Sequence, residues 1–157
     1  MSLTAFEYKT QGNEYYSRNE FLLSIESYTK AIELIENNIP EENDLSLDLL
    51  YSNRAAAYIK IKDFYAGYFD AKKSLKLKSE ENFKGSYRAA LCAYHLGFID
   101  KSKEFIKQAT TNHPDKLADF ADLKVLIEKK VQCMTKWRNP VATAKKGLHN
   151  LEHIINK

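Results

Sequence analysis

Residues 48–77 read DLLYSNRAAAYIKIKDFYAGYFDAKKSLKL, and this stretch decides the fold class. It splits into two helical halves around a short break at Lys62-Asp63. Each half contains a small residue, Ala55 in the first and Gly67 in the second, where two antiparallel helices must approach closely. Because a helix turns once per 3.6 residues, the larger groups around them stay on one face. The stretch therefore predicts a helical hairpin.

The same pattern occurs twice more. Residues 6–35 read FEYKTQGNEYYSRNEFLLSIESYTKAIELI and break at Arg18-Asn19-Glu20, and residues 83–114 read FKGSYRAALCAYHLGFIDKSKEFIKQATTNHP and break at Gly97-Phe98. The small positions coincide in all three stretches, which favours three copies of one ridge-and-groove hairpin over three unrelated amphipathic hairpins. These positions are Gly12, Ala55 and Ala90; Ser24, Gly67 and Ser102; and Ala31, Ser74 and Ala109.

The composition agrees with a helical protein of one domain. The 157 residues include only 5 Gly and 3 Pro, which favours helix over sheet. The net charge of this chain is only +3, whereas many nucleic-acid-binding proteins carry a large excess of basic residues. Cys92 and Cys133 form no CxxC pair, and no apolar run or leader pattern of the membrane or secretory type is present. We expect a cytoplasmic, soluble protein with no nucleic-acid or membrane partner.

The hairpins resemble the tetratricopeptide repeat, whose period is about 34 residues. Units starting at residues 5, 48 and 83 are spaced by 43 and 35 residues, so the first spacing is longer than one repeat. We predict that the extra residues lie in NNIPEENDLS at 37–46, where the flanking helices are longer and enclose a solvated turn. Pro114 closes the third unit, where repeats of this family often carry proline. The resemblance implies an all-α fold of three helix-turn-helix repeats in a right-handed superhelix.

A capping helix and a tail helix are expected after the repeats. Stacked repeats leave their last apolar face exposed, and residues 115–135 are predicted to cover it. Residues 136–157 restart after Asn139-Pro140 as a basic amphipathic extension, which could lengthen the cap, mediate self-association or bind a partner helix. The repeat domain is thus expected over 1–135, with repeats at about 5–38, 48–81 and 83–114. The apolar stripe of the cap is Leu117, Phe120, Leu123 and Ile127.

Five polar residues occupy the first helices of the three units, which form the concave wall of such a superhelix. Lys9 and Asn13 lie four positions apart, as do Lys84 and Arg88, so each pair shares one helix face. Asn53 stands between them on the second unit. These five residues and the short sequence motifs around them, YKTQGN, YSNRAA and KGSYRAA, resemble the two-carboxylate clamp of co-chaperones.

The resemblance implies a ligand, the C-terminal Glu-Glu-Val-Asp tail of heat-shock protein 90 (Hsp90), heat-shock protein 70 (Hsp70) or both. Its last residue presents two carboxylates, which lysine and arginine meet with charge and donors, arginine in a planar fork. Asparagine can both donate to an oxygen and accept from a peptide N–H. Beside the clamp we expect further groove residues that contact the preceding side chains, namely Tyr16, Ala56, Lys60 and Tyr87.

No catalytic residues, metal ligands or cofactors are predicted. The string His149-Asn150-Leu151-Glu152-His153 resembles a zinc-protease motif, but a catalytic zinc needs a third protein ligand, and a surface helix with two histidines is the ordinary explanation. His95, His113 and Cys92 are expected to be structural. The basic residues Lys136, Arg138, Lys145 and Lys146 are too few to predict a nucleic-acid or membrane site.

The expected function is therefore that of a co-chaperone adaptor and not of an enzyme. Two alternatives stay open. The repeats could form a scaffold for a different folded partner, or the chain could be the docking segment of a larger protein, because such clamps are also found in immunophilins, a phosphatase and ubiquitin ligases. The choice between Hsp90 and Hsp70 is open as well, since both tails share their last residues.

Overall fold

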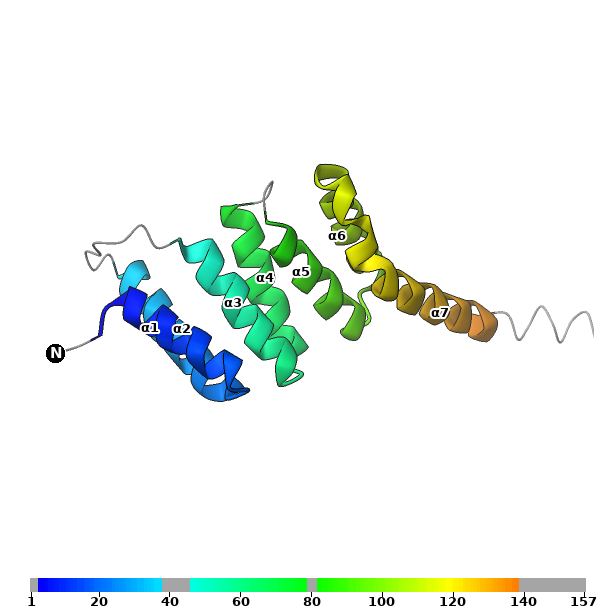
Figure 1. Cartoon of the computed structure of the whole chain (residues 1–157). Helices are drawn as coiled ribbons and strands as arrows, with labels where there is room; N and C mark the ends of the chain where they lie inside the picture. The colour runs from blue at the N-terminus through cyan, green and yellow to red at the C-terminus, as the bar shows by residue number, and fades with distance from the viewer. Residues whose placement is uncertain (1–2, 38–45, 79–81, 139–157) are drawn as a thin grey trace, which may run out of the picture. The chain divides into compact units, whose positions relative to one another are not determined.

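The computed structural model describes residues 3–37, 46–78 and 82–138, and every regular element within these ranges is a helix (Figure 1). The chain divides into two compact units, Met1–Ala118 and Asp119–Lys157. The elements in chain order are α1 (Ala5–Ser17), α2 (Phe21–Glu36), α3 (Leu47–Lys60), α4 (Phe64–Leu77), α5 (Phe83–His95), α6 (Ile99–Asn112), the 3-10 helix η1 (Pro114–Phe120) and α7 (Ala121–Arg138).

The first unit is a stack of three helical hairpins. Helix α1 packs on α2, α3 on α4, and α5 on α6. The second helix of each of the first two hairpins also packs on the first helix of the next one, α2 on α3 and α4 on α5. Figure 1 shows α1, α3 and α5 following one another along the stack. The predicted all-α architecture of three helix-turn-helix repeats is confirmed.

The three predicted breaks are one turn repeated. Asn19, Lys62 and Gly97 take left-handed backbone conformations, with φ of 62°, 62° and 83°. In each turn the following N–H donates to a carbonyl five residues back, which closes the end of the first helix as a Schellman motif does. The three bonds are Glu20 N to Tyr15 O at 2.9 Å, Asp63 N to Tyr58 O at 3.0 Å, and Phe98 N to Ala93 O at 2.8 Å.

The small residues bring the two helices of each hairpin together. The Ser24 hydroxyl donates to the Gly12 carbonyl at 2.9 Å, and the equivalent Ser102 hydroxyl donates to the Ala90 carbonyl at 2.7 Å. In the second hairpin Gly67 has no hydroxyl, and a Cβ there would lie 3.4 Å from the Ala55 carbonyl oxygen. The predicted register of small positions is therefore correct, and it has a hydrogen-bonding role as well as a steric one.

Helix starts follow local capping. Thr4 and Glu7 form a capping box at α1. The Asp63 side chain accepts from the Ala66 N–H at α4, and the Asn82 side chain accepts from the Gly85 N–H at α5. Of the predicted insertion at 37–46, Asn37 caps the end of α2 and Ser46 precedes α3, while its middle, residues 38–45, lies outside the described residues.

The segment predicted as a cap begins differently from expectation. Residues 114–120 form a 3-10 helix instead of the first turns of an α-helix, and Leu117 is 49% exposed, so it does not belong to the buried stripe. The other predicted members, Phe120, Leu123 and Ile127, are buried. Helix α7 runs to Arg138, past the expected boundary at 135. The capping role stays a prediction, and residues 139–157, with the tail helix and His149, lie outside the described residues.

Candidate peptide-binding groove

Three of the five predicted clamp residues meet in one pocket. Asn13 comes from α1, Asn53 from α3 and Arg88 from α5, so each of the three hairpins contributes one side chain. The first helices of the three hairpins stack side by side, and this stacking brings Asn13 close to Asn53, 40 positions later in the sequence. We call this space, of about 270 Å³, the asparagine pocket. Its lining is Asn13, Tyr16, Tyr28, Asn53, Ala56 and Arg88.

The Asn13 amide is held by two neighbours. Its Oδ1 accepts a hydrogen bond of 2.6 Å from the Tyr28 hydroxyl and a longer one of 3.5 Å from Asn53 Nδ2. Tyr28 is buried at the centre of the first hairpin, and burial raises the pKa of its hydroxyl, so it remains a neutral donor. Because Oδ1 is engaged, the amide donors of Asn13 are the groups left to face a ligand.

Arg88 is the positive centre of the groove. Its guanidinium donates through Nη1 to the hydroxyl of buried Ser52, and no carboxylate lies within ion-pair distance of it in the described part of the chain. Burial lowers the pKa of Arg88 below its ordinary value, although the Tyr16 and Tyr28 hydroxyls oppose this. A partly buried cation without a counter-charge is costly, and an anionic ligand would relieve that cost.

A second arginine shows the contrasting arrangement. The Arg54 side chain donates to both Asp70 oxygens, at 2.6 and 2.9 Å, and to the Thr29 hydroxyl at 2.9 Å. It lies over the rings of Tyr51 and Tyr58. Arg54 is thus fully engaged between the first two hairpins and serves their packing, whereas Arg88 lines the groove without a carboxylate partner among the described residues.

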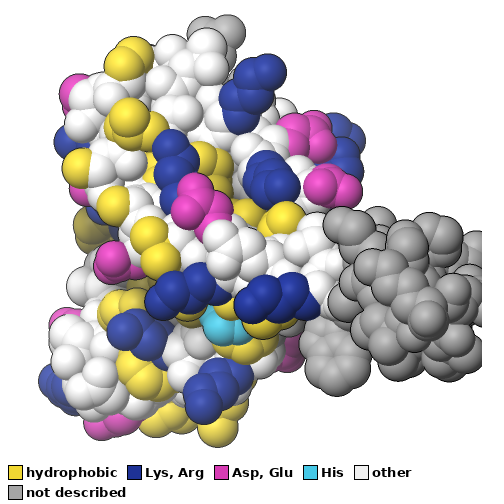
Figure 2. Space-filling model, turned by 90° about the vertical axis from the view of Figure 1, so that its right-hand side faces the viewer, with side chains coloured by type: hydrophobic (Ala, Val, Ile, Leu, Met, Phe, Trp, Pro, Cys, Tyr) yellow, Lys and Arg dark blue, Asp and Glu magenta, His cyan; other side chains and the backbone are white. Residues whose placement is uncertain are grey.

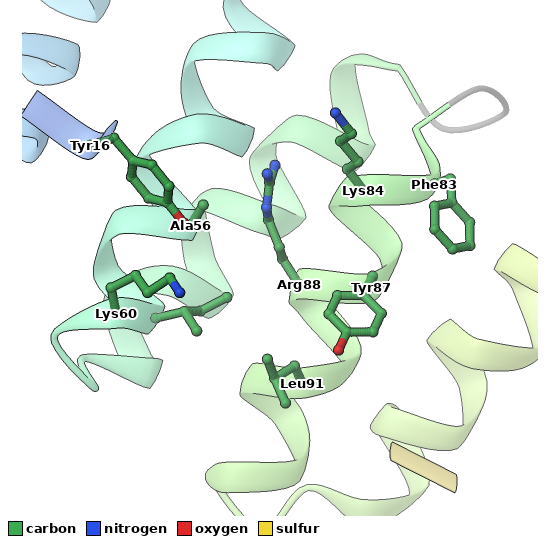
Figure 3. Close-up of a pocket in the computed structure, with 9 residues that line it drawn as sticks. Tyr16, Ala56, Lys60, Phe83, Lys84, Tyr87, Arg88 and Leu91 are labelled. Atoms are coloured by element: carbon green, nitrogen blue, oxygen red, sulfur yellow. The ribbon is translucent and has the colours of Figure 1, made fainter. Parts of the chain in front are cut away.

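A larger and more apolar pocket of about 360 Å³ adjoins the asparagine pocket. We call it the tyrosine pocket (Figure 3). Tyr16 extends from the end of α1 toward Ala56 on α3, and Lys84 and Arg88 extend from α5. All four side chains expected beside the clamp contribute to it. The lining is Tyr16, Ala56, Ile59, Lys60, Phe83, Lys84, Tyr87, Arg88 and Leu91.

A third pocket, of about 440 Å³, lies at the starts of α3 and α5, and we call it the lysine pocket. Its one carboxylate, Asp48, is buried and accepts from the Ser46 hydroxyl. Arg88 and Lys84 line both this pocket and the tyrosine pocket, and Arg88 also lines the asparagine pocket, so the three pockets adjoin one another and are together called the groove. The lining is Asp48, Leu49, Ser52, Asn53, Lys78, Asn82, Phe83, Lys84, Arg88 and Lys116.

Lys9 is placed differently from the other four predicted clamp residues. It lies on α1 one turn before Asn13, but it lines none of these three pockets, and its Nζ lies 5.5 Å from the centre of the Phe6 ring. Sequence reasoning also missed groove contributors. Tyr28, Ser52 and Leu91 were not predicted as groove residues, although Ser52 and Leu91 each stand four positions from a groove residue on the same helix.

Within residues 3–37, 46–78 and 82–138, no group of three or more His, Cys, Asp or Glu side chains is placed to hold a metal ion. The helices in those ranges are all too short or too polar to cross a membrane. Lys and Arg side chains are spread over the face drawn in Figure 2, with hydrophobic side chains exposed between them.

The stack of three hairpins, with its repeated turns and small-residue contacts, has the tetratricopeptide-repeat fold. No family model matches the chain. It is 30% identical over 156 residues, 98% of its length, to the DNA polymerase interacting tetratricopeptide repeat-containing protein of 47 kDa from Drosophila melanogaster. It is 37% identical over 109 residues, 69% of its length, to heat shock protein STI1 from Saccharomyces cerevisiae. The chain spans only 38% and 17% of these two relatives.

Solved structures agree on the fold. The first TPR domain of Spaghetti (RPAP3), which was solved bound to the HSP90 peptide SRMEEVD, superposes with a TM-score of 0.69. The match covers 82% of this chain and 94% of that one at 20% sequence identity. At this identity the likeness shows the fold alone. One repeat domain of this fold was therefore solved with an HSP90 peptide that ends in Glu-Glu-Val-Asp.

Proposed function

We propose that this protein is a co-chaperone adaptor whose groove binds the C-terminal Glu-Glu-Val-Asp tail of Hsp90 or Hsp70. The terminal aspartate would occupy the asparagine pocket, between Asn13, Asn53 and Arg88. Its two carboxylates would receive donors from both amides and from the guanidinium. Lys84, one helical turn before Arg88, adds a further positive charge at the edge.

The observation that supports this proposal most is the state of Arg88. It is the groove cation with a lowered pKa caused by burial, and a hydroxyl, not a carboxylate, is its partner. A protein that needed Arg88 only for packing would be expected to pair it, as Arg54 is paired with Asp70. A charge-assisted hydrogen bond contributes about 1.5 to 3 kcal/mol net, so a doubly charged ligand end suits this site.

The tyrosine pocket is suited to the ligand residues that precede the terminal aspartate and extend away from the clamp. Tyr16, Leu91 and Ala56 give it an apolar surface, which suits the valine and other apolar side chains before the final aspartate. Lys60 and Lys84 lie at its edges and suit the glutamates. Ordering a flexible tail costs about 2 to 5 kcal/mol, so we expect an affinity near 1 μM, or about 8 kcal/mol.

The experiment that tests the proposal compares two peptides that differ in one group. A peptide ending in Glu-Glu-Val-Asp with a free C-terminus should bind, and the same peptide with an amidated terminus should bind at least about tenfold more weakly, since one carboxylate is lost. The interaction should also weaken with added salt, because the groove is partly exposed. Equal binding of both peptides would favour a scaffold for a different partner.

A further inference from the structure

A separate pocket lies on the second helices of the repeats, between α4 and α6. Its volume is about 450 Å³, and we call it the outer pocket. Its lining shares no residue with the asparagine, tyrosine or lysine pocket, whose walls come mainly from α1, α3 and α5. The outer pocket is lined by Phe69, Lys72, Lys73, Leu75, Lys76, Phe105 and Gln108.

The charged members of this lining all have the same sign. Lys72, Lys73 and Lys76 lie on α4, and the described residues place no carboxylate within ion-pair distance of any of them. Lys73 donates to the Tyr51 hydroxyl at 3.2 Å, and that hydroxyl in turn donates to the Glu36 carboxylate, so Lys73 has a negative charge nearby, one hydroxyl away. The positive potential of the pocket edge therefore comes chiefly from Lys72 and Lys76, and an acidic ligand is complementary to it.

Apart from Gln108, the remaining lining is apolar, and Phe69 is its most exposed member. Phe69 is 47% exposed, and its ring lies 4.8 Å from that of Tyr65, which is 63% exposed. Phe105 is partly buried in the core against Tyr68, with ring centroids 6.1 Å apart. Large aromatic side chains left in water beside a pocket are typical of surfaces that bind another protein.

We propose that the outer pocket binds an acidic segment of a partner protein, which inserts an aromatic or leucine side chain against Phe69 and Phe105 and lays its carboxylates along Lys72, Lys73 and Lys76. Because the two surfaces share no lining residue, this segment and a carboxylate-ended tail in the groove can be bound at the same time. The domain would then connect two proteins through one rigid stack of helices.

Charge spacing favours a protein segment over a nucleic acid. The three lysines occupy positions 72 to 76 of one helix, which at 1.5 Å per residue is about 6 Å of helix length. A nucleic acid is held by cations distributed along its backbone, and its affinity depends on the number of phosphates neutralised. One short row of lysines around an apolar pocket suits a single side chain flanked by acidic neighbours better.

The test uses the whole chain and a synthetic probe that lacks the free terminal carboxylate of the proposed groove ligand. The probe is acetylated and amidated, with Glu at most positions and one Phe and two Leu at helical spacing. We expect it to bind the wild type by calorimetry, and to bind a Lys72→Glu/Lys76→Glu double variant at least about tenfold more weakly. Both lysines are exposed on α4, so circular dichroism should show an unchanged fold.

Matched controls separate a specific pocket from general charge attraction. Lys103→Glu makes one of the same charge changes on an exposed position of α6 outside the lining, and should alter the affinity less than about twofold. Phe69→Ala should weaken the probe, as should replacement of its Phe and Leu by Gln. A saturating Glu-Glu-Val-Asp peptide should leave the probe's affinity unchanged.

Four results would overturn the proposal. They are no binding of the probe to the wild type, equal binding to the double variant and to Lys103→Glu, equal binding of the probe that lacks Phe and Leu, or tighter, Lys72- and Lys76-dependent binding of a single-stranded oligonucleotide. Binding of the Glu-Glu-Val-Asp peptide is measured separately on the same samples. Failure of the outer pocket is therefore distinct from failure of the groove.

Discussion

The buried hydroxyl of Tyr28, on α2, donates a hydrogen bond of 2.6 Å to Oδ1 of Asn13 on α1. This bond joins the core of the first hairpin to the groove. The bond fixes the orientation of the Asn13 amide, because its oxygen accepts from Tyr28 and its nitrogen therefore points toward the pocket. Packing of the two helices thereby sets the chemistry that Asn13 presents.

Replacing Tyr28 with phenylalanine tests this coupling. Tyr28→Phe removes only the hydroxyl, so the free energy of unfolding should fall by about 1 kcal/mol, the worth of one hydrogen bond. Binding of a Glu-Glu-Val-Asp peptide should nevertheless weaken about three- to tenfold, because the Asn13 amide is free to turn its oxygen toward the carboxylates. Calorimetry together with urea denaturation measures both quantities. Unchanged affinity in a folded variant would show that Tyr28 does not orient Asn13.

The three equivalent turns predict opposite stability changes from opposite substitutions. Lys62 has φ of 62° and Gly97 has φ of 83°, a region that disfavours any side chain by about 1 to 2 kcal/mol. Lys62→Gly should therefore raise the free energy of unfolding by up to about 1 kcal/mol, and Gly97→Ala should lower it by about 1 to 2 kcal/mol. Urea denaturation of the two variants is the measurement. Shifts of the same sign would contradict the shared turn conformation.

The two cysteines should differ in reactivity. Cys92 is fully buried, and burial raises its pKa to about 12, whereas Cys133 is exposed on α7. At mildly alkaline pH a thiol reagent should modify Cys133 at once and Cys92 only at the rate of unfolding. Mass spectrometry of timed samples distinguishes the sites. Equally fast labelling of both would contradict the burial of Cys92 between α4 and α5.

The same shift makes stability depend on pH in a defined direction. The native state holds the Cys92 proton more tightly than the unfolded chain, whose thiols titrate near about pH 8.5. The contribution of the Cys92 proton to the free energy of unfolding is therefore complete below that pH and is lost as the pH rises toward about 12. Replacing Cys92 with serine should remove this part of the alkaline decline, as followed by urea denaturation at several pH values.

Much of the fold could be predicted from the sequence because the same pattern occurs three times and each copy can be compared with the others. A small residue at one position says little, but Gly12, Ala55 and Ala90 in register predict the helix contacts that the structure contains. The breaks were predictable for the same reason, and Asn19 and Gly97 are residues that favour a left-handed position. Lys62 is not such a residue, and it adopts this conformation because the flanking helices impose it.

The site was less accessible because register along a helix does not give distances across the groove. Spacing placed Lys9 on the same face as Asn13, yet its side chain lies over Phe6 and lines none of the three groove pockets. Likewise Tyr28 fits a packing role in the sequence pattern, and only three-dimensional geometry brings its hydroxyl to Asn13. Leu117 followed the helical period of the cap, but the 3-10 conformation of 114–120 turns it to solvent.

The most direct test of the central claim is calorimetric titration of the Glu-Glu-Val-Asp peptide into the wild type, Arg88→Ala and the control Arg18→Ala, whose arginine is exposed at the end of α1. We predict that the wild type and Arg18→Ala bind with similar affinity near 1 μM, and that binding to folded Arg88→Ala is weakened at least about a hundredfold, or about 3 kcal/mol. Equal affinity of Arg88→Ala and the wild type would contradict the assignment of Arg88 as the carboxylate-binding centre of the groove.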